Sequence, residues 1–334
     1  MLYILFCLLV PFWIAPEGDA TPPIIIEGVT MGTTYHITYF DSARRDFKKE
    51  VDSLLVLVNK CISTYDSSSE ISRFNRSRSG VEFQLPYLKE ALQKARQVYT
   101  GSEGAFDPTV MPLVNAWGFG PAALLAPSAH QIDSLKQLVG FNKVIFSDGG
   151  VYKTDSRVQL GLGGIGQGFG ADIVFEFLRS KGIDNLLVEL GGEGLSAGKN
   201  LQKNKAWVIG ILDPNSTVEN QFFKAYATLG DQAFTTSGNY FNYRIVDGKK
   251  YGHTIDPVTG YPVQSSLLSA SVFAADCSTA DAWATAFMVM GLDRAIEKLK
   301  TTPKLDALLI YSDAHGKICT YVTPGIKERV ILEP

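Results

Sequence analysis

Residues 161–172 read GLGGIGQGFGAD, and the first six of them match the pattern GxGxxG. The stretch lies between a strand-like segment and a helix that we expect from about Gly170 to Lys181. In a dinucleotide-binding fold such glycines let the backbone approach a phosphate at a helix N-terminus, and Glu189 lies where a ribose-binding acid would be expected. One match to this pattern is weak evidence of that fold. It does indicate a loop that lets a large group come close to its backbone.

The segments around this loop favour a different fold class. Asp-Gly turns join two pairs of strand-like segments, 144–146 with 151–153 and 243–246 with 251–255, as is typical of β-hairpins. Further strands are expected at 24–26, 33–39, 186–190, 207–212, 224–229, 307–311 and 318–322, and helices at 44–62, 88–99, 132–138, 170–181 and 279–290. Hairpins mixed irregularly with helices predict an α+β protein with mixed antiparallel sheets and flanking helices. Residues 21–334 show no repeat or long linker, so we expect one domain.

Composition excludes some classes of protein. The chain has 334 residues, of which 46% are hydrophobic and 19% are charged, so it can bury a large core and is too apolar for disorder. Lys and Arg number 31 against 34 Asp and Glu, a net charge of −3. Because no basic footprint is present, nucleic acid is not an expected partner.

The N-terminus predicts export. Residues 1–15 form an uncharged apolar run, shorter than the roughly 20 residues that a membrane-spanning helix needs. Gly18 and Ala20 have the spacing of a signal-peptidase site, so residues 1–20 are interpreted as a signal peptide. The alternative is an uncleaved N-terminal anchor, since no Lys or Arg precedes Arg44. We therefore expect an exported, periplasmic protein, either free or attached to the inner membrane. The widely spaced Cys61, Cys277 and Cys319 predict no disulfide framework.

A second pattern, GxSxG, occurs at Gly194, Ser196 and Gly198, with Asp213 and His253 downstream in the order of a hydrolase triad. A nucleophilic serine of that kind needs a helix directly after it. Residues 199–205 are instead polar and aperiodic, so we interpret Ser196 as an ordinary serine in a loop.

A third group of residues has the types that metal-assisted chemistry needs. Residues 251–262, YGHTIDPVTGYP, form a dense turn that places His253 near Asp256. Asp281 and Thr285 are four residues apart, on one face of a predicted helix rich in alanine. Hard oxygen ligands in small number suit Mg²⁺, which fills its shell with water and substrate phosphate. From spacing alone, the alternative is that Asp281 caps the helix or forms a salt bridge, and that the Thr285 hydroxyl donates a hydrogen bond to a main-chain carbonyl of its own helix.

Together with further stretches, these residues resemble the ApbE family, flavin transferases that attach FMN from FAD to a protein threonine. The likeness runs from Met31 to about Gly291. It comprises 31–33 (MGT), 63–65 (STY), 69–75 (SEISRFN), 104–108 (GAFDP), 113–120 (LVNAWGFG), 161–172, 189–193 (ELGGE), 236–238 (TSG), 253–257 (HTIDP) and 278–285 (STADAWAT). Each stretch is unremarkable alone, but their order is highly specific.

The resemblance implies a T-fold-like α+β domain with a flavin site between two lobes. It implies that Asp281, Thr285 and the main-chain oxygen of Gly164 bind Mg²⁺, and that His253 is the general base. The positions that match the FAD site are Met31, Tyr65, Ala105, Phe106, Asp107, Gly161, Gln167 and Ile255. Two of these depart from the family pattern, because Gly161 replaces a usual aspartate and Gln167 replaces a usual lysine or glutamate.

The activity implied is Mg²⁺-dependent transfer of the FMN moiety of FAD to a Thr or Ser hydroxyl, with release of AMP. The acceptor would be an exported or membrane protein, such as a membrane redox subunit. One alternative is an Mg²⁺-dependent FAD pyrophosphatase, in which water replaces the hydroxyl. Another is a non-catalytic periplasmic flavin-binding protein, against which the presence of His253, Asp281 and Thr285 argues.

Overall fold

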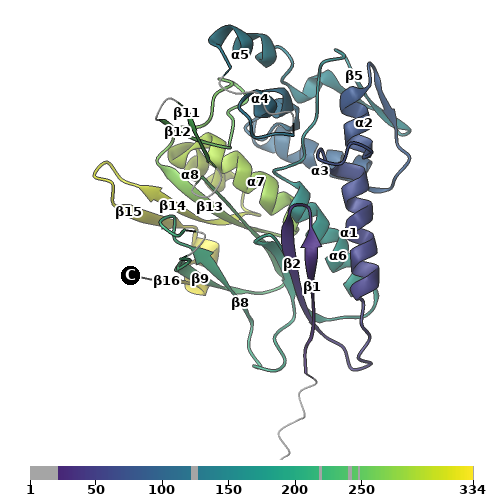
Figure 1. Cartoon of the computed structure of the whole chain (residues 1–334). Coiled ribbons are helices and arrows are strands. Elements are labelled where there is room, and N and C mark those ends of the chain that lie inside the picture. Colours follow the sequence, from purple (N-terminus) through teal and green to yellow (C-terminus); the bar gives the residue numbers. More distant parts are fainter. Residues whose placement is uncertain (1–21, 122–126, 218–219, 240–242, 247–248, 334) are drawn as a thin grey trace, which may run out of the picture.

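A large antiparallel sheet runs through the centre of the molecule (Figure 1). The computed structural model describes residues 22–121, 127–217, 220–239, 243–246 and 249–333, so the signal or anchor expected at residues 1–20 lies outside the described residues. In spatial order the strands of the large sheet are β1 (Ile24–Thr30), β2 (Thr33–Phe40), β6 (Asn185–Leu190), β7 (Glu193–Ala197), β10 (Gln232–Gly238), β13 (Leu267–Ala274), β14 (Asp306–Ser312) and β15 (Ile318–Val322). Each is antiparallel to its neighbours.

Smaller sheets and helices surround the large sheet. The smaller sheets are β8 (Trp207–Leu212) with β9 (Phe223–Leu229) and β16 (Val330–Leu332), then β3 (Gly80–Glu82) with β4 (Val144–Phe146) and β5 (Gly150–Lys153), and the hairpin of β11 (Tyr243–Val246) and β12 (Lys249–Gly252). The α-helices are α1 (Lys48–Ile62), α2 (Glu70–Arg76), α3 (Tyr87–Gly101), α4 (Met111–Ala116), α5 (Ala129–Lys136), α6 (Gly166–Ser180), α7 (Cys277–Met290) and α8 (Leu292–Thr301). Short 3-10 helices cover Pro108–Val110, Phe141–Lys143 and Pro324–Arg329. The arrangement confirms the predicted α+β class.

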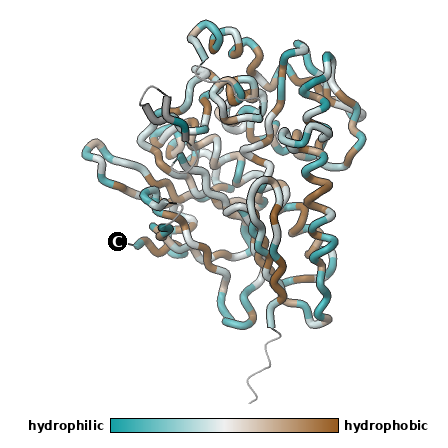
Figure 2. The backbone as a smooth tube through the Cα atoms, in the orientation of Figure 1, coloured by the Kyte–Doolittle hydropathy of each residue, from teal (hydrophilic) through white to brown (hydrophobic). Residues whose placement is uncertain are grey.

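Both faces of the large sheet are covered. Successive residues of a strand point to opposite faces, and in β10 Ala233 packs with α6 residues whereas Phe234 packs with residues of β8 and β9. Figure 1 shows α1, α6 and α7 along one face and the sheet of β8, β9 and β16 against the other. In Figure 2, hydrophobic segments follow α1 and the strands of the large sheet, while the outer loops are mostly hydrophilic. The buried sheet therefore provides a fixed base for α6 and α7.

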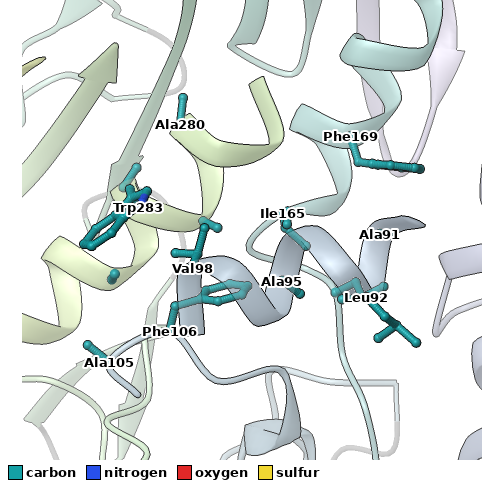
Figure 3. Packing of buried hydrophobic residues seen from close by; sticks show 14 of the residues in the cluster. Ala91, Leu92, Ala95, Val98, Ala105, Phe106, Ile165, Phe169, Ala280 and Trp283 are labelled. Atoms are coloured by element: carbon teal, nitrogen blue, oxygen red, sulfur yellow. The ribbon is translucent and has the colours of Figure 1, made fainter. Parts of the chain in front are cut away.

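The largest buried cluster joins α3, α6 and α7 (Figure 3). Four alanines of α7 are fully buried there: Ala280, Ala282, Ala284 and Ala286. Their small side chains let neighbouring segments approach the helix, and a Cβ added to Gly101 of α3 would lie only 3.0 Å from the ring of Trp283. Helix α3 therefore approaches α7 closely at this point. No helix among the described residues is both long and apolar enough to cross a membrane.

Several elements differ from the sequence-based expectations. The first helix begins at Lys48 rather than Arg44, because the Asp41 side chain accepts hydrogen bonds from the amides of Ala43 and Arg45 and holds a turn there. The helix expected from Gly170 begins four residues earlier, at Gly166. The expected loop around Ser196 is strand β7. The sequence patterns also did not predict α2, α4, α8, β10 and β13.

Candidate metal and flavin site

The glycine-rich loop before α6 packs directly on α7. A Cβ added to Gly164 would lie 2.7 Å from the Thr285 hydroxyl oxygen. A Cβ added to Gly168 would lie 2.4 Å from the main-chain oxygen of Cys277 and 2.9 Å from the Cβ of Asp281. At Gly168 the obstacle is backbone, so glycine is required there, whereas at Gly164 the obstacle is the Thr285 side chain. The structure therefore brings together the three residues predicted to bind metal: Gly164, Asp281 and Thr285.

Asp281 is buried at the centre of this contact. One of its carboxylate oxygens accepts a hydrogen bond of 3.1 Å from the amide of Gly168. Burial raises the pKa of Asp281 to about 7, the Gly168 amide lowers it in part, and the negative charge of Asp172 raises it further. A carboxylate in such a place is stabilised by any cation that enters, because the protein provides little compensation for its charge.

Asp172 of α6 anchors the start of α7. Its carboxylate accepts hydrogen bonds from the amides of Cys277 at 2.7 Å and Ser278 at 2.8 Å, and also from the Ser278 hydroxyl. The Asp276 side chain accepts a further bond of 2.9 Å from the amide of Thr279. These side chains satisfy amides that the first turn of a helix leaves without intrahelical partners. The position of Asp281 in the next turn is fixed as a result.

Met31 and Gln167 lie at the start of α6. Met31 is in the turn between β1 and β2 with a φ of 51°, and its side chain lies 3.1 Å from a Cβ built on Gly170. The Gln167 amide nitrogen is 2.8 Å from a Cβ built on Gly191, in the loop between β6 and β7. Two sequence-predicted flavin residues are therefore close to the predicted metal ligands.

A second group of predicted residues follows α3. Ala105, Phe106 and Asp107 are all buried, and Phe106 lies within the core shown in Figure 3. One oxygen of Asp107 accepts hydrogen bonds from the amide and the hydroxyl of Thr109, at 2.8 Å and 2.6 Å. Burial raises the pKa of Asp107 to about 6, although these hydrogen bonds lower it in part. Ala105 and Phe106 present little side-chain surface to a ligand.

Gly161 is held next to this group. Its amide donates a hydrogen bond of 2.8 Å to the main-chain oxygen of Pro108. A Cβ added to Gly161 would lie 2.6 Å from the sulfur of Met111, so the Met111 side chain occupies the space next to the glycine. The same side chain is 3.0 Å from a Cβ built on Gly120. Met111 thus connects the glycine-rich loop with the segment that follows α4.

The residues around Phe119 form a third group. The rings of Phe119 and His253 are in edge-to-face contact, with centroids 6.4 Å apart. The Tyr65 hydroxyl donates a hydrogen bond of 3.4 Å to the Phe119 carbonyl, and 75% of Tyr65 is exposed. Arg244 lies 5.6 Å from the centre of the Phe119 ring and donates a hydrogen bond to the carbonyl of Gly118. The predicted base and one predicted flavin residue therefore meet at Phe119.

A buried cluster and a hydrogen bond hold the turn that carries His253. Ile255 forms a bridge with Pro262 and is buried in a cluster with Leu113 and Trp117. The Trp117 indole donates a hydrogen bond of 2.8 Å to the Gly260 carbonyl. Ile255, predicted to bind flavin, is buried in this cluster and so holds the turn in place.

Some members of these groups were not singled out from the sequence. Three of them belong to the motifs quoted above: Asp172, Glu193 and Phe119. No local pattern shows that Asp172 anchors a helix, that Oε2 of Glu193 has no partner among the described residues, or that Phe119 contacts His253. Arg244 is in no motif. Its contact with Phe119 joins segments more than one hundred residues apart, which no local pattern shows.

The two deceptive motifs are explained by the fold. The GxGxxG loop leads into α6, but the strand that follows, β6, is antiparallel to both of its neighbours, so no parallel βαβ unit forms. Ser196 is buried within β7, where its hydroxyl donates a hydrogen bond of 2.7 Å to the Gly230 carbonyl. A buried serine in a strand is not a nucleophile elbow.

The fold and site define an α+β protein in which a glycine-rich helix start packs on a buried acid and a hydroxyl. The profile of the ApbE family matches residues 31–309, and the chain belongs to this family. It is 37% identical over 282 residues to the FAD:protein FMN transferase of Vibrio cholerae, covering 81% of this chain and 82% of that protein. It is 36% identical to the FAD:protein FMN transferase of Haemophilus influenzae, covering 88% of each.

Solved structures agree with this assignment. The flavin transferase ApbE from Vibrio cholerae superposes with a TM-score of 0.83 at 33% identity, over 92% of this chain and 99% of that one. The apo form of the Pseudomonas stutzeri flavinyl transferase ApbE gives a TM-score of 0.81 at 30% identity, over 92% and 96%. These findings confirm the family and the fold class predicted from the sequence, and with them the expectation that the chain is an enzyme.

The donor set at α7 is suitable for Mg²⁺. It combines a buried carboxylate, a hydroxyl and a main-chain oxygen, all hard ligands. Among the described residues, no group of three or more His, Cys, Asp or Glu side chains is arranged to hold a metal ion alone. A cation bound here would therefore complete its shell with water or with the substrate, as Mg²⁺ does in phosphate chemistry.

Proposed function

We propose that this chain transfers the FMN moiety of FAD to a threonine or serine hydroxyl of an acceptor protein, in an Mg²⁺-dependent reaction that releases AMP. The observation that carries the proposal is the packing of the glycine-rich loop on Asp281 and Thr285. This packing brings a carboxylate and a hydroxyl next to the loop, in which Gly163 has open space at its Cβ position, and it therefore supports a cation and a large ligand bound side by side. The relatives named FAD:protein FMN transferase supply the substrate and the kind of acceptor.

The reaction forms one P–O bond, breaks another and transfers one proton. The acceptor hydroxyl oxygen attacks the phosphorus on the FMN side of the pyrophosphate, and the bond from this phosphorus to the bridging oxygen breaks. The electron pair leaves with AMP, and the hydroxyl proton passes to the imidazole of His253. An imidazole is suited to this role because its ordinary pKa is near neutral.

Each part of the site has a task in this reaction. Asp281, Thr285 and the Gly164 carbonyl would hold Mg²⁺, which when bound offsets the charge of the pyrophosphate and of the departing AMP. The amides of the glycine-rich loop can donate hydrogen bonds to phosphate oxygens at the start of α6. Phe119 orients His253, and the exposed ring of Tyr65 offers a flat apolar surface for an aromatic ring of FAD.

The acceptor is proposed to be an exported or membrane protein, such as a membrane redox subunit. This follows from the apolar N-terminal segment, which predicts that the enzyme is exported to the periplasm, either free or attached to the inner membrane. Transfer to a protein hydroxyl also requires an acceptor segment that can reach His253. The half-exposed position of that residue allows this.

The test is to incubate the purified protein with FAD, MgCl₂ and a membrane fraction from a strain that lacks it. Flavin fluorescence on a denaturing gel, absent when EDTA replaces MgCl₂, is the expected result. Free FMN and AMP without a labelled band would indicate the pyrophosphatase instead. FAD that remains intact would indicate a flavin-binding protein without activity.

A further inference from the structure

Glu193 is a buried acid with no role in the reaction proposed above. The residue is 8% exposed, and its Oε2 atom has no hydrogen-bond partner among the described residues. An unpaired carboxylate oxygen in a protein interior costs free energy unless another group compensates it. The surroundings of the Glu193 side chain determine which group can compensate it.

Strand geometry directs Glu193 toward α7. Residues alternate along β7, and Leu195 and Ala197 pack in the cluster that contains Cys277 of α7, so Glu193 belongs to the same face. Gly194 pairs with Phe234 of β10, which places Glu193 near Thr235. The Thr235 hydroxyl in turn contacts the Cys277 sulfur at 3.6 Å. Glu193 therefore faces the first turns of α7, where Asp281 lies.

The charged side chains that act on Glu193 are negative. Burial first, and then the charges of Asp281 and Glu189, raise the pKa of Glu193 well above its ordinary value. Within the described part of the chain, no positive side chain lowers the pKa of Glu193 or Asp281. The neighbouring Asp172 adds further negative charge beside Asp281, and its own oxygens accept hydrogen bonds from the amides of Cys277 and Ser278.

We propose that Glu193 supplies a second carboxylate, through Oε2, to the cation held by Asp281, Thr285 and Gly164. This inference rests on the metal site of the proposed function. Two carboxylates bind a divalent cation more tightly than one does, so the site should bind Mg²⁺ before FAD arrives. A site with Asp281 as its single carboxylate would instead depend on substrate phosphates to retain the metal.

The test measures Mg²⁺ binding by isothermal titration calorimetry on the full chain without FAD, with thermal unfolding as a second readout. Glu193→Gln should bind Mg²⁺ at least about tenfold more weakly than the wild type, and MgCl₂ should raise its Tm by less. Glu82→Gln is the control, since it removes the same charge from an exposed side chain in β3, and it should bind Mg²⁺ as the wild type does. Glutamine has the shape of glutamate, and the Tm without metal verifies that each variant folds.

The outcomes separate this inference from the proposed function. If Asp281→Asn abolishes binding while Glu193→Gln binds normally, Glu193 is not a ligand and the metal site stands. If Asp281→Asn also binds normally, the metal assignment itself is wrong. If the wild-type protein binds no Mg²⁺ until FAD is added, the proposal that Glu193 is a second carboxylate ligand is wrong.

Discussion

Replacing Gly168 by alanine tests whether the contact between α6 and α7 builds the site. The added Cβ would lie 2.4 Å from the Cys277 carbonyl oxygen, about 1 Å less than an ordinary contact of 3.4 Å. Because the obstacle is backbone rather than the end of a side chain, the two helices must separate. The 3.1 Å hydrogen bond from the Gly168 amide to Asp281 would then be lost.

Two costs add in this variant. Overpacking of a buried contact costs about 1–3 kcal/mol, and loss of a buried hydrogen bond costs about 1–3 kcal/mol. We therefore expect Gly168→Ala to reduce the free energy of unfolding by roughly 2–6 kcal/mol and to lower the Tm by several degrees. Mg²⁺ binding should weaken as well, since Asp281 is displaced.

The control is Gly163→Ala in the same loop, where an added Cβ meets nothing within 4 Å. It should change the free energy of unfolding by less than about 1 kcal/mol. Gly164→Ala is intermediate, because its Cβ meets the Thr285 side chain, which can rotate; it should lose Mg²⁺ affinity with a smaller loss of stability. Denaturant unfolding and calorimetry measure both effects. Equal stability and Mg²⁺ affinity of Gly168→Ala and Gly163→Ala would refute the reasoning.

Four further predictions concern the flavin residues and the base. Folding raises the Asp107 pKa from 3.8 to about 6, so this group favours the folded state at pH 4 and loses that contribution as the pH rises through 6. Asp107→Asn keeps an oxygen that can accept both hydrogen bonds from Thr109. It should therefore raise the free energy of unfolding by up to roughly 3 kcal/mol at pH 7.5 but by little at pH 4. An equal change at both pH values in denaturant unfolding would contradict this. His253→Gln should slow transfer by about 10²–10⁴ while FAD affinity, measured by fluorescence titration, is retained; near-normal transfer would exclude it as the base. Tyr65→Ala should weaken FAD binding about threefold to tenfold without a change in Tm, because the side chain is largely exposed. Gly161→Asp should tighten FAD binding once Met111 rotates away, and unchanged affinity would show that the missing carboxylate has no role.

The sequence predicted the fold class because hairpin turns and helical periodicity are local signals. It did not predict β13, because a buried strand of a covered sheet lacks the alternation of polar and apolar residues that marks an exposed strand. It did not predict β10 either, because most residues of that strand are small or polar. The same limit explains the misinterpretation of Ser196, whose strand is buried along its whole length.

The site shows the same division between local and distant information. The four-residue spacing of Asp281 and Thr285 places both on one face of α7, and this could be inferred directly. The approach of Gly168 to Cys277 could not, since it joins segments more than one hundred residues apart. That Oε2 of Glu193 has no hydrogen-bond partner among the described residues is likewise a property of the assembled sheet and helices.

Mass spectrometry of the labelled acceptor tests the central claim most directly. The band that becomes fluorescent with FAD and MgCl₂ should contain one threonine or serine whose mass has increased by FMN less one water, with one AMP released per modified residue. The Asp281→Ala variant should fold and yield no such product. Unmodified acceptor alongside equal amounts of free FMN and AMP would contradict protein flavinylation, and full labelling by Asp281→Ala would contradict the metal site.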